Sequence, residues 1–307
     1  MFRRHRIQHE TVIPSGKFFA LGNYKKIHKI DMEETNAEQP EKASPLENDS
    51  LALLRKRLRG EETLQCPMGN EFLLKFLRAR KFDADAAFKT IQKYFRARRD
   101  YPRIFENFSP SGMLYDVICR EHKLLAVSSD RDPHGRAVML VRTGAWNTSI
   151  CTLDEFTKAC FVLVEWLLLD EDVQKRGVVF VIDHKGLSLH HVMQFTPFAI
   201  QRLVRLTQDC YPVGVKAVYI TSCPAIFHIL FSITKTFMRN KLAQRVHVIG
   251  SEIEKLRGVV PSDVISKEAG GTFESYDYDK LKRDLLSRSE YFQEVGHYGY
   301  DKTNTHH

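Results

Sequence analysis

The sequence predicts an α/β protein: an N-terminal helical bundle followed by an α/β domain with a mostly parallel sheet. Two patterns lead to this prediction. From about residue 49 to residue 100, apolar residues recur at helical spacing among basic ones. After Pro110, short runs of β-branched and aliphatic residues alternate with longer helical stretches. Such alternation is typical of parallel strands joined by crossover helices.

Three helices are expected in the bundle, at about residues 49–58, 71–78 and 84–100. Asp83 directly precedes the third, where its carboxylate can cap the first turn. The segment before them, residues 1–47, is basic in its first part and acidic in its second, with poor apolar periodicity. This composition is typical of a disordered arm.

Four strands are expected in the second part, at residues 124–127, 138–141, 178–182 and 217–221. The sequence Asp132-Pro133-His134-Gly135 is typical of a turn, so the first two strands should form a hairpin. We therefore divide the chain into a disordered arm (1–47), a helical bundle (48–105), an α/β domain (106–280) and a C-terminal tail (281–307).

The balance of charge favours an anionic partner. Lys and Arg total 46 against 38 Asp and Glu, which gives a formal net charge of +8. No apolar run reaches transmembrane length, no secretory signal is recognisable, and none of the six Cys belongs to a C-x-x-C pair. We expect a cytoplasmic protein with reduced thiols that associates peripherally with membranes, including endosomal ones. The oligomeric state stays open.

The familiar catalytic signatures are missing from the sequence, so we expect no enzyme, no metal and no cofactor other than a bound lipophile. His184, His190 and His191 cluster in a strand-to-loop region, but no Cys or spaced carboxylate accompanies them. We interpret them as exposed loop histidines. Asp183 precedes Lys185-Gly186 and is interpreted as a turn-forming residue rather than a catalytic acid.

An apolar helix is expected at residues 224–237. Ile226, Ile229, Leu230, Ile233 and Phe237 form a stripe at helical spacing, and a second face carries Phe227 and Phe231. Two interpretations stay open: a fully buried core helix, or a lid with one face over a hydrophobic ligand and the other against lipid.

A cationic segment surrounds and follows this helix. Between Cys210 and Ser251 there is no Asp or Glu, whereas five cations occur, namely Lys216, Lys235, Arg239, Lys241 and Arg245. A straight helix would separate Arg239 from Lys241, so we expect a bend at 236–240, with Asn240 capping a new turn. A second cationic cluster lies in the bundle: Lys75, Arg78, Arg80, Lys81 and Lys89. Because no nucleic-acid reader is recognisable, we expect anionic membrane lipid rather than nucleic acid.

Several segments together resemble the CRAL-TRIO lipid-transfer family, in particular its branch of tocopherol carriers, retinaldehyde carriers and clavesins. They are residues 72–82, 181–186, 211–212, 224–227, 235–237 and 268–272. The resemblance implies a sheet that floors a hydrophobic cavity, with residues 224–237 as a mobile gate helix. The sequence departs from the family at Thr236 and at Ile265-Ser266, where the family has proline; this removes a restraint on φ.

The resemblance also implies site residues. Phosphoinositide-binding positions are Arg80, Lys89, Lys241 and Arg245, together with Lys216, which lies two residues beyond the family position occupied here by Gly214. Pocket candidates are Cys160, Phe161, Val164, Leu187, Leu206, Tyr211, Val213, Val215, Val218, Ile226, Ile229 and Ile233. The predicted function is a soluble carrier of one lipophile, such as a tocopherol or retinoid, exchanged at phosphoinositide-containing membranes. The alternative is a phosphoinositide-binding adaptor in membrane trafficking.

Overall fold

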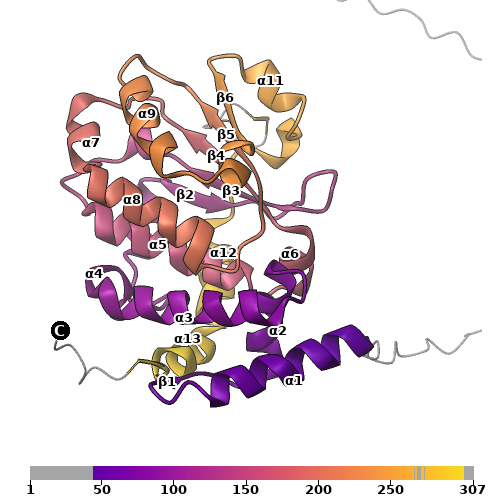
Figure 1. Cartoon of the computed structure of the whole chain (residues 1–307). Helices are drawn as coiled ribbons and strands as arrows, with labels where there is room; N and C mark the ends of the chain where they lie inside the picture. The colour runs from indigo at the N-terminus through magenta and orange to yellow at the C-terminus, as the bar shows by residue number, and fades with distance from the viewer. Residues whose placement is uncertain (1–43, 266, 268–270, 273, 301–307) are drawn as a thin grey trace, which may run out of the picture. The chain divides into compact units, whose positions relative to one another are not determined.

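A computed structural model describes residues 44–265, 267, 271–272 and 274–300 (Figure 1). The predicted arm up to residue 43, Ser266 and residues 268–270 of the Gly-Gly segment lie outside the described residues. The mixed α/β class and the mostly parallel sheet are confirmed.

The N-terminal region is helical, as predicted. It contains α1 (Pro45–Arg59), α2 (Asn70–Ala79), α3 (Ala84–Asp100) and the short α4 (Pro102–Phe105). Asp83 does cap α3, since its side chain accepts from the backbone N–H of Ala86 at 2.9 Å. The first helix begins before the predicted residue 49. The Ser44 hydroxyl caps it, and Pro45 supplies a φ suited to the first helical position.

The central sheet has the strand order β2-β3-β4-β5-β6. β2 (Leu125–Val127) and β3 (Ala137–Val141) are antiparallel, which confirms the hairpin. β4 (Val178–Asp183), β5 (Val215–Thr221) and β6 (Val246–Gly250) continue the sheet in parallel. The sequence did not predict β6, because two of its five residues, His247 and Val248, are exposed and its pattern is not that of a buried strand.

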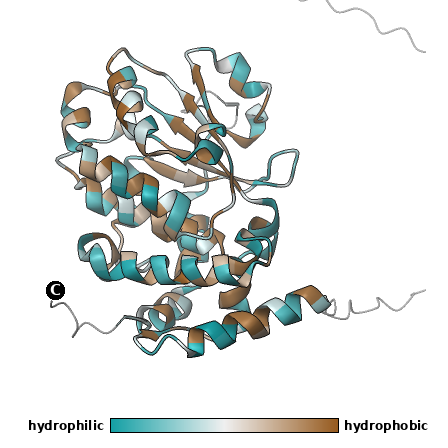
Figure 2. Cartoon of the chain, viewed as in Figure 1, coloured by the Kyte–Doolittle hydropathy of each residue, from teal (hydrophilic) through white to brown (hydrophobic). Residues whose placement is uncertain are grey.

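Helices between the parallel strands, and one helix after β6, surround the sheet. They are α5 (Leu153–Leu167), α6 (Glu171–Arg176), α7 (Leu189–Gln194), α8 (Pro197–Arg205), α9 (Phe227–Phe237), α10 (Asn240–Ala243) and α11 (Ile253–Arg257). Figure 2 shows apolar strands at the centre and helices with mixed faces around them. Because side chains alternate along a strand, Val179 and Val181 join the larger core, whereas Phe180 and Ile182 face a cavity under α5, α8 and α9.

The end of the described chain returns to the bundle. Residues predicted as a tail form most of α12 (Tyr278–Leu286), then α13 (Ser289–Gly296) and β7 (Gly299–Tyr300). β7 pairs antiparallel with β1 (Leu64–Gln65). Leu285, Phe292 and Val295 are buried in the main core. Residues 281–300 are therefore part of the folded domain rather than an appendage.

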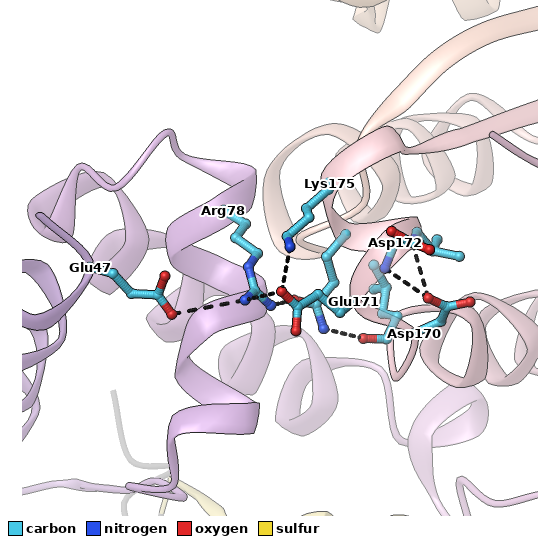
Figure 3. A network of polar contacts seen from close by, with 9 residues as sticks. Glu47, Arg78, Asp170, Glu171, Asp172 and Lys175 are labelled. Carbon is cyan, nitrogen blue, oxygen red and sulfur yellow. Dashed lines mark hydrogen bonds and ion pairs between the residues drawn. The ribbon is translucent and has the colours of Figure 1, made fainter. Parts of the chain in front are cut away.

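Two cations predicted for a surface cluster instead hold the bundle to the α/β region. The Arg78 guanidinium lies 2.9 Å from Glu171 on α6 and 3.9 Å from Glu47 on α1 (Figure 3). Lys75 is buried, and its ammonium contacts Glu165 on α5. Assigning Lys75 and Arg78 to a free cationic surface was wrong, because acidic partners that are distant in sequence neutralise both.

Candidate functional site: an apolar cavity beside a basic hollow

A cavity of about 290 Å³ lies between one face of the sheet and helices α5, α8 and α9. This volume is close to the lower end of the range for small-molecule sites. The strands contribute Met139, Val141, Phe180, Ile182, Val218, Ile220 and Val246; the helices contribute Leu153, Phe156, Cys160, Phe161, Val164, Ile200, Leu203, Val204, Phe227, Leu230 and Phe231, among others. The wall suits a hydrocarbon ligand.

Helix α9 forms one side of the cavity along its whole length. Phe227, at its first residue, and Met238, just beyond its last, both line the wall. An α-helix of 11 residues is about 16 Å long. The predicted helix started at Pro224, but residues 224–226 form a turn instead. The expected bend is confirmed by the break between α9 and α10, although Arg239 and not Asn240 occupies the N-cap position of α10.

Of the predicted apolar stripe of α9, only Leu230 lines the cavity. Phe227, Leu230, Phe231 and Thr234 line the cavity, whereas the side chain of Ile229 is on the outside, with Ile229 59% exposed. Both faces of this helix are apolar, so helical spacing alone did not distinguish the inner stripe from the outer one.

The structure brings some of the predicted pocket residues to the cavity wall: Cys160, Phe161, Val164, Val213 and Val218. Four others, Leu187, Val215, Ile226 and Ile233, belong to the surrounding apolar cluster without lining the cavity. Leu206 and Tyr211 belong to the larger core, where Tyr211 packs against Phe161 with ring centroids 4.6 Å apart. Neither residue is part of the cavity lining.

Sequence reasoning missed the polar part of the wall. His184 was interpreted as an exposed loop residue, but it is only 6% exposed and lines the cavity with Thr143. Burial lowers the pKa of His184 to about 4, against the opposite effect of Asp183. The imidazole is therefore neutral at physiological pH. The turn role of Asp183 is confirmed, because its carboxylate accepts from the backbone N–H of Lys185 at 3.0 Å.

A second hollow, of about 400 Å³, lies where α2 and α3 meet the α10 region. Its cations are Arg80, Lys89, Lys93, Arg239, Lys241 and Arg245. The pKa of Lys241 is lowered by partial burial and by the neighbouring charges of Arg245, Lys81, Arg80 and Lys216. The structure thus brings Arg80 and Lys89 of the bundle together with Arg239, Lys241 and Arg245, with Lys216 beside the hollow rather than in its lining. Lys93 was not predicted as a site residue.

Three cations of this basic hollow are held by contacts. Arg239 lies 2.7 Å from Asp209, Arg80 donates to the Thr90 hydroxyl at 2.8 Å, and Arg245 donates to the Val215 carbonyl. Within the described part of the chain, Lys89, Lys93 and Lys241 form no ion pair. Three ammonium groups are therefore available to an anion.

The cavity and the basic hollow are neighbours. Thr207, Val213 and Leu242 line both of them. In addition, Gln208 of the hollow donates to the Phe237 carbonyl at 3.1 Å and accepts from the Arg239 N–H at 3.0 Å. The C-terminal end of α9 is thus anchored to residues of the basic hollow.

Across the described ranges, no group of three or more His, Cys, Asp or Glu side chains is arranged to hold a metal ion. The helices in that part of the chain are also too short or too polar to cross a membrane.

An apolar cavity lies between this sheet and a helix that is anchored at its C-terminal end, and a basic hollow lies beside it. These features define a lipid-binding α/β protein. The chain belongs to the CRAL-TRIO family: residues 121–271 match the CRAL/TRIO domain and residues 38–93 match the CRAL/TRIO N-terminal domain. This confirms the resemblance seen in the sequence.

Individual relatives support the assignment. The chain is 35% identical over 240 residues to the alpha-tocopherol transfer protein-like protein of Mus musculus, which covers 78% of this chain and 69% of the relative. It is 28% identical over 217 residues to Clavesin-1 of Rattus norvegicus, covering 70% of this chain and 60% of that protein. The crystal structure of Sfh5 superposes with a TM-score of 0.53 at 15% identity, over 80% of this chain and 98% of that one. The last similarity concerns the fold alone.

Proposed function

We propose that this protein carries one lipophilic molecule in the cavity and exchanges it at membranes that display phosphoinositides. The observation that carries this proposal is the position of Gln208, Asp209 and Arg239. They contribute to the basic hollow and also hold the joint between α9 and α10. An anion bound in the hollow therefore acts on the same residues that fix the end of the gate helix.

The ligand is held by burial of apolar surface. Each Å² of apolar area removed from water contributes on the order of 25 cal/mol. Four large apolar residues on α7, α8 and α9 remain exposed on the outside: Leu189, Met193, Phe198 and Ile229. Figure 1 shows these three helices near one another. Such side chains suit contact with lipid, where their exposure is no longer unfavourable.

Docking is electrostatic. Each cation near an anionic membrane contributes about 1 kcal/mol. In the exchange step, a headgroup phosphate competes with Asp209 for Arg239, and the end of α9 loses one of its anchors. The helix then moves toward lipid, and the ligand leaves or enters. Met238 and Arg239 are extended residues between two helices and form the joint for this motion.

The test is a transfer assay between liposomes with and without phosphoinositide, using Lys89→Glu/Lys241→Glu. Neither side chain forms an ion pair within the described residues, so the fold should be retained. The matched control is Lys255→Glu/Lys280→Glu, which changes the charge equally on α11 and α12. We expect the first variant to lose phosphoinositide-stimulated transfer and the control to keep it. Equal transfer by both variants would overturn the docking role of the hollow.

The same variants separate the carrier from the trafficking adaptor. The hollow alone would suit an adaptor, but the cavity favours a carrier. For a carrier, the amount of labelled lipophile moved between membranes should rise with the amount of protein docked on them. A protein that docks through the hollow and never delivers a cavity ligand would instead be an adaptor.

A further inference from the structure

The wall of the cavity carries no formal charge. Its lining contains no Lys, Arg, Asp or Glu among the described residues. A ligand with a carboxylate or phosphate inside this cavity would bury an unpaired anion, which is strongly unfavourable. The wall therefore disfavours burial of an ionised carboxylate or phosphate within the cavity.

Most of the polar lining residues already donate their hydroxyl hydrogen to a backbone carbonyl. Thr157, Thr207 and Thr234 each lie on a helical segment and donate to the carbonyl four residues earlier, at 2.6, 3.0 and 2.8 Å. This back-bonding is common for threonine in helices. These hydroxyls have no proton left to offer a ligand.

His184 differs from those threonines. Its Nδ1 lies 2.5 Å from the Thr143 hydroxyl, and its ring packs on Phe227 of α9 with centroids 5.0 Å apart. Within the described part of the chain its other nitrogen, Nε2, has no hydrogen-bond partner. Nε2 is not among the fully buried unpartnered atoms, so it keeps accessible surface, and His184 lines the cavity. An occupant that bonds to this nitrogen gains a hydrogen bond inside an otherwise apolar wall.

The backbone fixes this pair. His184 N–H donates to the Thr221 carbonyl at 3.1 Å. The turn that carries Thr143 approaches closely because the next residue is Gly144. A Cβ there would come within 2.3 Å of the Lys185 carbonyl oxygen. The close approach of Gly144 to the Lys185 carbonyl, which only glycine permits, thus places Thr143 next to His184.

We propose that His184, oriented by Thr143, is the specificity-determining residue of the cavity and binds the hydroxyl of a neutral lipid alcohol. A hydroxyl both donates and accepts, so it pairs with Nε2 in either tautomer. A pure hydrocarbon leaves Nε2 unpaired, and an acid adds an unpaired charge. The neutral state of the imidazole agrees with a wall that contains no counterion. This inference rests on the proposed carrier function and names the chemical class of the cargo.

The experiment loads the full-length protein from liposomes that contain a matched alcohol and hydrocarbon in equal amounts. Three skeletons are used: hexadecan-1-ol with hexadecane, phytol with phytane, and cholesterol with cholestene. Hexadecanoic acid is added as the anionic comparison. The repurified protein is extracted, and the lipids are quantified by mass spectrometry. Wild type, His184→Phe and the control His190→Phe on α7 are loaded from the same liposomes, so membrane partitioning cancels between them.

For the skeleton that binds best, we expect the alcohol-to-hydrocarbon ratio of wild type to exceed that of His184→Phe by about tenfold, the worth of one buried hydrogen bond. His190→Phe should match wild type, and His184→Gln, whose amide donates and accepts, should restore most of the preference. Should the phenylalanine variant fail to fold, His184→Leu gives the same comparison.

A ratio unchanged by His184→Phe, or preferential uptake of the acid, would overturn the assignment of His184 while leaving a lipid carrier. Retention of no lipid of any class by wild type would instead contradict the proposed carrier function.

Discussion

The ammonium of Lys75 lies 2.6 Å from a carboxylate oxygen of Glu165, and both side chains are only 1% exposed. The Tyr291 hydroxyl accepts from Lys75 at 2.5 Å and donates to Glu165 at 2.6 Å. The Tyr94 hydroxyl donates to the other Glu165 oxygen at 3.0 Å. Helices α2, α3, α5 and α13 therefore meet at one buried polar cluster, which joins the bundle to the lipid-binding region.

Burial lowers the pKa of Lys75, although the adjacent Glu165 opposes this change. Burial alone would raise the pKa of Glu165, but Lys75 and Arg98 outweigh it, so that pKa is lowered. Lys75→Met should reduce the free energy of unfolding by about 3–5 kcal/mol, because it leaves the carboxylate buried without its partner. Urea denaturation measures this.

The double variant Lys75→Met/Glu165→Leu should recover part of that loss, because no charge is then left unpaired. Lys280→Met serves as the control. It breaks an exposed pair with Asp284 and should cost less than about 1 kcal/mol. A Lys75→Met effect as small as that of the control would show that the buried pair does not hold these helices together.

His184 should make stability depend on pH. Burial lowers its folded-state pKa to about 4, whereas an unfolded histidine titrates near 6.5. Between these values the unfolded chain binds a proton that the folded protein does not. The stabilisation is complete above pH 6.5 and is lost as the pH falls to 4, by up to about 3 kcal/mol. His184→Gln should show a smaller decrease over this window. Identical pH profiles for both proteins would contradict a neutral buried imidazole.

The two faces of α9 should respond differently to the same kind of change. Ile229→Ser, on the outer face, should leave ligand retention unchanged and weaken liposome binding by about tenfold, because an apolar side chain that enters lipid is lost. Leu230→Ser, on the inner face, should shorten ligand retention. Retention is followed by ligand off-rate and binding by flotation. If Ile229→Ser shortened retention and Leu230→Ser weakened liposome binding instead, Ile229 rather than Leu230 would face the ligand.

The Asp209–Arg239 pair should restrain the gate. Asp209→Asn removes the negative charge 2.7 Å from Arg239 and should raise the rate of ligand loss severalfold in the absence of phosphoinositide. The stimulation by phosphoinositide should shrink accordingly. Asp172→Asn, which affects an exposed pair with Arg176, is the matched control. An unchanged basal rate for Asp209→Asn would show that headgroup competition at this pair does not open the cavity.

Local patterns predicted the elements well and the directions of side chains less well. Helical periodicity found α2 and α3, and the Asp-Pro-His-Gly turn identified the β2–β3 hairpin. Periodicity could not choose between two apolar faces of α9. It also did not reveal that Lys75 is buried, because its partner Glu165 is 90 residues away in the sequence.

The sequence did not reveal the polar part of the cavity wall, for a related reason. Thr143 and His184 lie 41 positions apart and meet only because β3 and β4 are adjacent in the sheet. A lone histidine after a strand is indistinguishable from a loop residue in the sequence. The same holds for α13, whose buried residues contact a bundle more than 180 residues earlier, as the pair Lys75–Tyr291 illustrates.

The proposed carrier function requires the cavity to hold one exchangeable lipophile. Native mass spectrometry of the full-length protein, purified without detergent and then incubated with liposomes carrying the lipid alcohols above, tests this most directly. We expect a single added mass at one-to-one stoichiometry, identified after dissociation as a neutral lipid. Protein that remains empty after exposure to all of these lipids would contradict it.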